Sequence, residues 1–156
     1  MRIHLIAVGT RIPSWISEGY QEYARRMPHG CALDLHEIPA AKRGKSTSLE
    51  RALQTECRQM LDRIPDGCRV IALDVRGKAW STEALAQELR DWLGSGRDIA
   101  LLVGGADGLS ADCLERADLK WSLSALTYPH ALVRVVLAEQ LYRAWTITTG
   151  HPYHRS

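Results

Sequence analysis

The stretch ALLVGGADGLS, residues 100–110, joins a continuous apolar segment to a glycine-rich turn and then to a serine that suits the start of a helix. A short run without polar residues is typical of a strand that is buried on both faces of a sheet. Such strands belong to α/β proteins, in which helices cover both faces of a mainly parallel sheet. The stretch therefore indicates an α/β fold.

The same alternation of strand and helix extends in both directions from this stretch. Apolar or alternating runs predict strands at residues 3–8, 31–38, 70–74, 99–103 and 119–123. Capping residues and helical periodicity predict helices that begin near residues 14, 49, 81, 110 and 131, with Thr47 and Glu50 as a capping box before the second. Residues 76–78 are expected to turn the chain. This order predicts an α/β fold with a mainly parallel sheet and helices on both faces, in a single domain over residues 1–156.

The composition narrows the class of protein without defining its function. The chain has 156 residues, 46% of them hydrophobic, and a formal net charge of +2, so bulk charge does not favour nucleic-acid binding by itself. Because Cys31, Cys57, Cys68 and Cys113 show neither a CxxC pair nor zinc-like spacing with histidines, we expect reduced thiols and no metal. We also expect a cytoplasmic protein without membrane association, since no bilayer-spanning segment or signal peptide is evident.

Residues 104–108, GGADG, form a candidate binding loop after the predicted fourth strand. Glycines let a ligand approach the backbone, and the N–H groups of a following helix attract polar ligand atoms, although a glycine-rich turn without a ligand is also possible. The loop is neither GxGxxG nor a Walker A loop. A dinucleotide site would also place an acidic residue about 20 positions later, where this chain has WSLS at residues 121–124. NAD binding is therefore disfavoured.

A second unusual loop is LSALTYPH, residues 123–130, which is too apolar for an ordinary solvated connection. A ligand with an adenine edge would give its backbone groups partners, whereas the alternative is a loop packed beneath the next helix. In open α/β sheets, ligands bind beyond the carboxyl ends of the strands. We therefore expect residues 73–74, 104–105 and 123–128 to lie on one rim.

The C-terminal part combines an apolar helix with a polar tail. The predicted helix at residues 131–148 is apolar on two sides, and a homodimer partner is the simple source of a second covering layer. Glu139 and Arg143, four residues apart, suit either a surface ion pair or an arginine that holds a phosphate. The tail GHPYHRS, residues 150–156, offers a titratable base, a stacking surface and a phosphate contact, although chain ends are often frayed.

Basic residues gather in the loop at residues 40–48 and at the end of the first predicted helix. They could contact phosphates regardless of base sequence, or they could form a solvated basic face. The modest net charge favours local docking on a structured RNA over general affinity for nucleic acids. The residues in question are Arg25, Arg26, Lys42, Arg43 and Lys45.

Several of these segments together resemble a known family. LLVGGADGLS, WSLSALTYPHALVRVVLAEQLYRAW and the terminal GHPYHR, with AVGT near the N-terminus and the KRGK loop, resemble the SPOUT-class RlmH family over nearly the whole chain. Members of that family methylate N3 of a pseudouridine in ribosomal RNA. The resemblance implies a SPOUT-type fold with a C-terminal trefoil knot at about residues 70–150. It also implies S-adenosyl-L-methionine as cofactor, a homodimer, and 23S rRNA in the assembled ribosome as substrate.

The matched motifs carry the family's cofactor contacts onto this chain. Tyr128 stands where leucine or phenylalanine is more usual, a change that should matter little if the contact is through the backbone. Residues 106–107, Ala-Asp, stand where Pro-Glu or similar pairs occur. The implied cofactor residues are Leu73, Gly104, Leu123, Ser124, Ala125, Leu126, Thr127 and Tyr128.

The implied reaction gives the tail a chemical role. The N3–H of a pseudouridine is weakly acidic, so a base, or stabilisation of the deprotonated ring, would help. His154 is the candidate base or hydrogen-bond partner, and Tyr153 could stack on the nucleobase. Arg143 and Arg155 could stabilise negative charge or hold phosphate. A non-catalytic ribosome- or RNA-binding protein with the same fold is the alternative function, and a nucleotide-binding oxidoreductase is a third, disfavoured one.

Overall fold

The computed structural model describes residues 1–46 and 48–155. Within these ranges the chain forms five strands, five α-helices and two short 3-10 helices, and the predicted alternation of strand and helix is confirmed. The strands are β1 (Arg2–Val8), β2 (Ala32–Ile38), β3 (Arg69–Ala79), β4 (Ile99–Val103) and β5 (Leu119–Ser122). The helices are α1 (Ser14–Ala24), η1 (His29–Cys31), α2 (Leu49–Asp62), α3 (Thr82–Ser95), α4 (Ala111–Arg116), α5 (Leu132–Thr149) and η2 (Pro152–Arg155).

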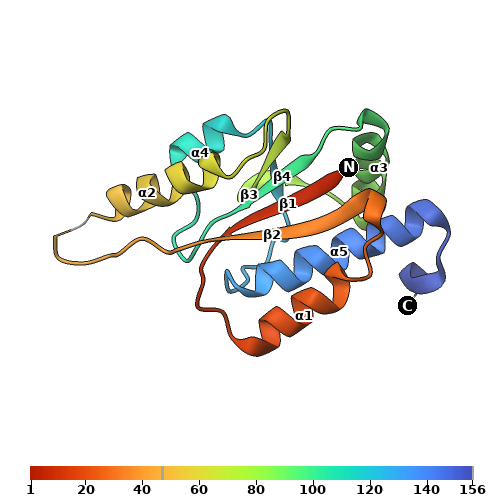
Figure 1. Cartoon of the computed structure of the whole chain (residues 1–156), viewed down its shortest axis with the longest axis horizontal. Coiled ribbons are helices and arrows are strands. Elements are labelled where there is room, and N and C mark those ends of the chain that lie inside the picture. The colour runs from red at the N-terminus through yellow and green to blue at the C-terminus, as the bar shows by residue number, and fades with distance from the viewer. Residues whose placement is uncertain (47, 156) are drawn as a thin grey trace.

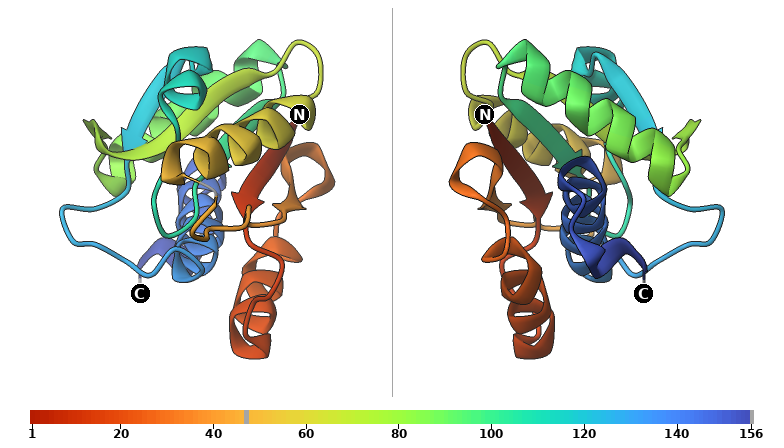
Figure 2. Two further views of the ribbon diagram at one scale, coloured as in Figure 1. Left: turned by 90° about the vertical axis from the view of Figure 1, so that its left-hand side faces the viewer. Right: turned by 90° about the vertical axis from the view of Figure 1, so that its right-hand side faces the viewer.

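The strands form one sheet in the order β2-β1-β4-β3-β5, and each neighbouring pair is parallel. Helices α2 and α4 cover one face, while α1 and α5 lie on the other (Figure 1), and the side views show the same layers (Figure 2). The predicted α/β class with helices on both faces is confirmed. Because the strands are parallel, their carboxyl ends share one edge of the sheet and their amino ends share the other.

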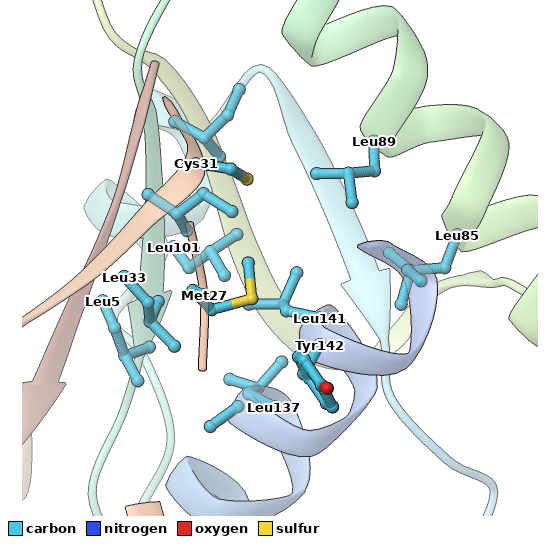
Figure 3. Packing of buried hydrophobic residues seen from close by; sticks show 14 of the residues in the cluster. Leu5, Met27, Cys31, Leu33, Leu85, Leu89, Leu101, Leu137, Leu141 and Tyr142 are labelled. Carbon is cyan, nitrogen blue, oxygen red and sulfur yellow. The ribbon is translucent and has the colours of Figure 1, made fainter. Parts of the chain in front are cut away.

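Two apolar cores hold these layers together, because successive strand residues point to opposite faces of the sheet. On β1, Ile3 and Leu5 belong to the core beneath α1, α3 and α5. Ile6 and Val8 belong to the core beneath α2 and α4. Figure 3 shows the first core, in which side chains from the strands, α3 and α5 converge. Burial on both faces explains why β1 and β4 are almost continuously apolar, whereas β2, at the edge of the sheet, alternates apolar and polar residues.

Helix α5 packs against both α1 and α3, so it occupies the middle of its layer. Leu137, Leu141 and Ala144 are fully buried towards the core. The second apolar side of this helix was expected to be covered by a partner. Helices of the same chain cover part of it instead. Val133 and Val136 remain only half-buried.

Strand β3 is longer than predicted, because residues 76–78 continue the strand and do not turn the chain. The pairing with β5 shifts register between Leu73 and Lys78, and Lys78 and Leu73 both oppose Trp121. A Cβ atom on Gly77 would lie 2.6 Å from the carbonyl carbon of Lys120, so the backbones meet where no side chain fits. The glycine that indicated a turn instead permits a close approach of two strands.

Helix α2 begins after Ser48, whose hydroxyl accepts a hydrogen bond from the Arg51 N–H at 3.2 Å. The predicted capping residue Thr47 lies outside the described residues. Ser81 and Ser110 cap α3 and α4 in the same way, as their positions in the sequence predicted.

In the described part of the chain, no helix is both long and apolar enough to cross a membrane. The trefoil knot at about residues 70–150 stays a prediction, because strand order and pairing do not define the path of the chain through its loops. The single domain over residues 1–156 stays a prediction as well.

Candidate functional site

A cavity lies where β4 and β5 end, beside the middle of β3, and these three strands are neighbours in the sheet. Parallel pairing brings the segments that follow β4 and β5 together with residues 73–75, which lie within β3 and not after it. The three segments predicted to share one rim therefore do meet. The first residues of α5 close the remaining side. The lining residues are Leu73, Asp74, Val75, Val103, Gly104, Gly105, Gly108, Ser122, Leu123, Ser124, Leu126, Thr127, Tyr128, His130 and Val133.

The glycine loop at residues 104–108 turns tightly at one wall of this cavity. A Cβ atom on Gly104 would lie 2.4 Å from the carbonyl carbon of Gly108, a distance that real Cβ atoms essentially never show. The Gly108 N–H donates to the Gly105 carbonyl at 3.0 Å, and Gly108 has a φ of 77°. The loop therefore needs glycine for close backbone contact and for a left-handed residue.

The apolar loop at residues 123–130 leaves much of its backbone available to a ligand. Among the described residues, no backbone-to-backbone hydrogen bond involves residues 124–128. The Leu126 N–H donates to the Ser124 hydroxyl at 2.9 Å, while Leu126 itself is 72% exposed. The Leu126 side chain exposes apolar surface, and the neighbouring backbone groups can exchange water for a ligand, so this segment suits an amphipathic ligand.

The structure brings most of the predicted cofactor residues together. The cavity is lined by Leu73, Gly104 and five residues of the segment 123–128. The sixth residue of that segment, Ala125, is exposed and does not line the cavity. Their contact with a cofactor stays a prediction.

Sequence reasoning missed two residues at this rim, His130 and Arg134. His130 lines the cavity and belongs to the loop that was already singled out. Arg134 is 2% exposed, and it donates to the Gly9 carbonyl and to the Glu37 carboxylate, both at 2.6 Å. This buried arginine connects the start of α5 to the carboxyl ends of β1 and β2. The sequence did not indicate this role, because the surrounding residues are typical of an apolar helix.

The side chain of Arg43 is held by other residues of the protein, so it is not available for a phosphate contact. Its guanidinium group donates to the buried Glu56 carboxylate at 2.8 Å and to Asp107 in the glycine loop at 2.8 Å. Glu56 in turn accepts from the Ala41 N–H at 2.9 Å. The network fixes the basic loop to α2 and to the glycine loop, so Arg43 has a structural role that the sequence did not indicate.

The other basic candidates divide into paired and exposed residues. Arg25 and Arg26 both donate to Glu22 on α1, which reduces their availability to phosphate. Lys42 and Lys45 are exposed in the loop that extends from the body of the protein (Figure 1). The expected basic contacts with RNA therefore concentrate on these two lysines.

The tail is ordered against α5 through Tyr153, not frayed. The Tyr153 hydroxyl lies 3.0 Å from Glu139, and the Arg143 guanidinium lies 5.2 Å from the centroid of the Tyr153 ring. Arg143 also donates to Glu139 at 2.7 Å. Tyr142 packs on Tyr153 with ring centroids 4.7 Å apart. Burial raises the pKa of the Tyr153 hydroxyl well above its usual range, so this hydroxyl stays protonated at neutral pH.

The described chain does not bring the predicted catalytic residues to the cavity. The cavity lies at the start of α5, whereas Tyr153, His154 and Arg155 follow its end (Figure 1). Helix α5 has 18 residues and is therefore about 27 Å long. The Nδ1 atom of His154 is buried without a hydrogen-bond partner among the described residues. The catalytic roles of Tyr153, His154, Arg155 and Arg143 stay predictions.

Comparison with known proteins agrees with this architecture. Residues 1–154 match the family model described as "Predicted SPOUT methyltransferase". The ribosomal RNA large subunit methyltransferase H of Alkalilimnicola ehrlichii is 62% identical over 100% of both chains. That of Thioalkalivibrio sulfidiphilus is 59% identical over 99% of both.

Solved structures share the fold at low sequence identity. A probable methylase family protein from Haemophilus influenzae has a TM-score of 0.55 at 16% identity, covering 97% of this chain and 69% of its own. TrmJ from Z. mobilis has a TM-score of 0.55 at 17% identity, covering 92% of this chain and 70% of its own. The expected SPOUT-type fold is confirmed. The chain therefore belongs to the SPOUT methyltransferases and, within them, to the RlmH family.

Proposed function

We propose that the protein methylates N3 of a pseudouridine in the 23S rRNA of the assembled ribosome, with S-adenosyl-L-methionine bound in the rim cavity. The observation that carries this proposal is the meeting of the glycine loop and residues 123–128 around one cavity. The relatives named ribosomal RNA large subunit methyltransferase H support the class of substrate. Pseudouridine N3 and the cofactor rest on the family resemblance.

The cavity residues fit such a cofactor on chemical grounds. Leu73, Leu123 and Leu126 supply apolar walls for a nucleoside. The backbone of residues 125, 127 and 128, which makes no hydrogen bond among the described residues, supplies donors and acceptors for an adenine edge. Gly104 leaves room for close approach to the backbone. The bound cofactor would supply an activated methyl group on a sulfonium. The task of the protein is then to hold the acceptor nitrogen in line with that group.

The tail residues supply what the acceptor needs. N3 must lose its proton, and His154 is the proposed base or hydrogen-bond partner for this step. Arg155 is proposed to stabilise the negative charge that develops on the ring. Because the pKa of Tyr153 is raised, its hydroxyl is a poor base, and its ring is better suited to stacking on the nucleobase. Arg143 keeps the Tyr153 ring in place and is a candidate for a phosphate contact.

We infer that these residues act on the cavity of a second copy in a homodimer. Within one chain the tail sits at the far end of α5 from the cavity, so a partner is the direct source of His154 and Arg155. The half-buried Val136 on α5 lines a hollow beside α3, which gives such a partner a place to dock. The unpaired buried Nδ1 of His154 also favours a different tail position, since an orphaned polar atom costs about 1–3 kcal/mol.

Lys42 and Lys45 are proposed to contact rRNA phosphates. They are exposed on a loop whose base is fixed by Arg43, so the positive charge is presented at a defined place. Phosphate contacts of this kind position a protein on RNA without reading its sequence. The assembled ribosome then supplies the remaining specificity.

Two measurements test the proposed function. Calorimetric titration should show binding of S-adenosyl-L-methionine and none of NADH. Transfer of labelled methyl groups to ribosomes that lack the modification, with the modified base mapped, should place the label on pseudouridine N3. Binding of the cofactor without any transfer to ribosomes would instead favour a non-catalytic ribosome-binding protein.

A further inference from the structure

A second cluster of reactive side chains lies at the opposite edge of the sheet, where the strands begin. His4 is on β1, Cys68 directly precedes β3, and Asp98 directly precedes β4. In the register of the sheet, Ile99 pairs with both Ile3 and Arg69, so the starts of these three strands are neighbours. The strand register thus assembles residues that are about 30 to 94 positions apart in the sequence.

The three side chains offer a nitrogen, a sulfur and an oxygen at short range. One potential ligand atom from each residue lies within 4.8 Å of the others. His4 Nε2 is 3.1 Å from Asp98 Oδ2. The His4 and Cys68 residues are 8% and 4% exposed, so solvent does not compete strongly for them. Asp98 keeps 35% of its side chain exposed, which leaves one side of the cluster open to water.

Further hydrogen bonds orient the two polar members of the cluster. The Arg2 N–H donates to Asp98 Oδ1 at 2.9 Å, which leaves Oδ2 directed towards His4. The opposite ring nitrogen of His4, Nδ1, is 3.1 Å from Nε2 of His36. Metal-binding histidines and carboxylates are commonly held by such outer hydrogen bonds, which fix the ring orientation and leave the other atom for the ion.

We propose that His4 Nε2, Cys68 Sγ and Asp98 Oδ2 bind a zinc ion, with water as the fourth ligand. Zinc takes nitrogen, sulfur and oxygen ligands at about 2.0–2.3 Å, which places neighbouring ligand atoms about 3.3–3.8 Å apart in a tetrahedron. The His4–Asp98 distance is already close to this spacing, and Cys68 needs only a small side-chain adjustment. A thiolate ligand favours zinc over magnesium and calcium, which prefer oxygen.

The charges of the site suit a divalent cation. Zinc binding would release the thiol proton to solvent, and the resulting thiolate and the Asp98 carboxylate would balance the two charges of the ion. The His36 ring nitrogen Nε2 lies where it can accept a hydrogen bond from the His4 Nδ1–H, which leaves His4 Nε2 for the ion.

The ion would connect three strands at the edge opposite the cofactor cavity. Its expected effect is on the stability of the fold, since a ligand that binds only the folded state stabilises that state. The proposal does not depend on the proposed methyl transfer, and no cavity residue takes part in it.

Cobalt(II) provides the test, because it replaces zinc in such sites and its bond to a thiolate gives a charge-transfer absorption. The full-length protein, first dialysed against a chelator, is titrated with cobalt and then with zinc. We expect the thiolate band to saturate at one cobalt per chain and to disappear when zinc is added. Cys68→Ser should abolish the band, and Asp98→Asn, which keeps the side-chain shape, should weaken cobalt binding by about a hundredfold or more.

Matched controls separate this site from other thiols and histidines. Cys57 and Cys113 have sulfur atoms 2.7 Å apart between α2 and α4, and could hold a thiophilic metal themselves. Cys113→Ser and His29→Ala should therefore leave the band unchanged, and circular dichroism should show that each variant is folded. Absence of a thiolate band in the wild-type protein would overturn the proposal. A band that survives Cys68→Ser, or one that is lost with Cys113→Ser, would overturn it as well.

Discussion

The cofactor cavity and the C-terminal tail are built in different ways. The shape of the cavity depends on the backbone: β4 and β5 end beside the middle of β3, Gly104 contacts Gly108, and the backbone of residues 125, 127 and 128 makes no hydrogen bond within the described chain. The tail is held by side chains, chiefly Tyr153 against Glu139 and Tyr142, at the far end of α5. The difference suggests that cofactor binding is a property of one chain, whereas methyl transfer needs a second one.

The largest effect is expected from Gly104→Ala, which places a Cβ atom against the Gly108 carbonyl carbon. The loop must open to accept it, so binding of S-adenosyl-L-methionine should fall below detection in calorimetry, and transfer should stop. Gly94→Ala is the matched control, because a Cβ atom there meets nothing within 4 Å. Normal binding by a folded Gly104→Ala protein would contradict the assignment of this wall.

His154→Ala should show that the tail contributes to methyl transfer and not to cofactor binding. We expect methyl transfer to fall by about 10²- to 10⁴-fold, the usual contribution of a general base, with unchanged affinity for the cofactor. A chain that ends at Gly150 should behave in the same way, and His29→Ala should be normal. Near-normal transfer to ribosomes by both tail variants would exclude a catalytic tail.

Charge reversals in the basic loop should have two distinct results. Arg43→Glu leaves the buried Glu56 without its partner, and should lower the free energy of unfolding by about 2 kcal/mol, measured by urea denaturation. Lys42→Glu with Lys45→Glu should leave stability unchanged and weaken ribosome binding, most clearly at low salt. Equal stability of the Arg43 variant and the double lysine variant would show that the network around Glu56 is unimportant.

The smallest effect is expected from Tyr153→Phe, which removes the hydroxyl near Glu139 and keeps the ring. The free energy that holds the tail against α5 should fall by about 0.5–1.5 kcal/mol. This loss should be visible as faster hydrogen exchange at residues 151–155. If the ring stacks on the nucleobase, methyl transfer should stay close to normal. A large loss of transfer would instead assign a chemical role to the hydroxyl.

Much of the fold could be predicted from the sequence, because strands buried on both faces and serine-capped helices leave local patterns. Residues 99–103 and Ser110 were placed correctly for this reason. Gly77 was misread, since a glycine that allows close contact of β3 with β5 looks the same in sequence as a glycine in a turn. Arg43 was misread because its partners, Glu56 and Asp107, are distant in the chain.

The site was predictable to a similar extent. The rim cavity followed from the topology of parallel strands, and it collects most of the residues that the family motif implied. The role of Arg134 could not be predicted, because its partners Gly9 and Glu37 belong to other strands. The cluster of His4, Cys68 and Asp98 was missed for the same reason: spacing along the chain does not reveal what strand register brings together.

Mixing two inactive variants tests the central claim most directly. One variant carries Gly104→Ala and an intact tail, and the other carries His154→Ala and an intact cavity. After subunit exchange, half of the dimers are mixed and each holds one complete site, so about a quarter of wild-type methyl transfer should return. Two folded, exchanging variants whose mixture stays inactive would contradict the account, because each tail would then serve only the cavity of its own chain.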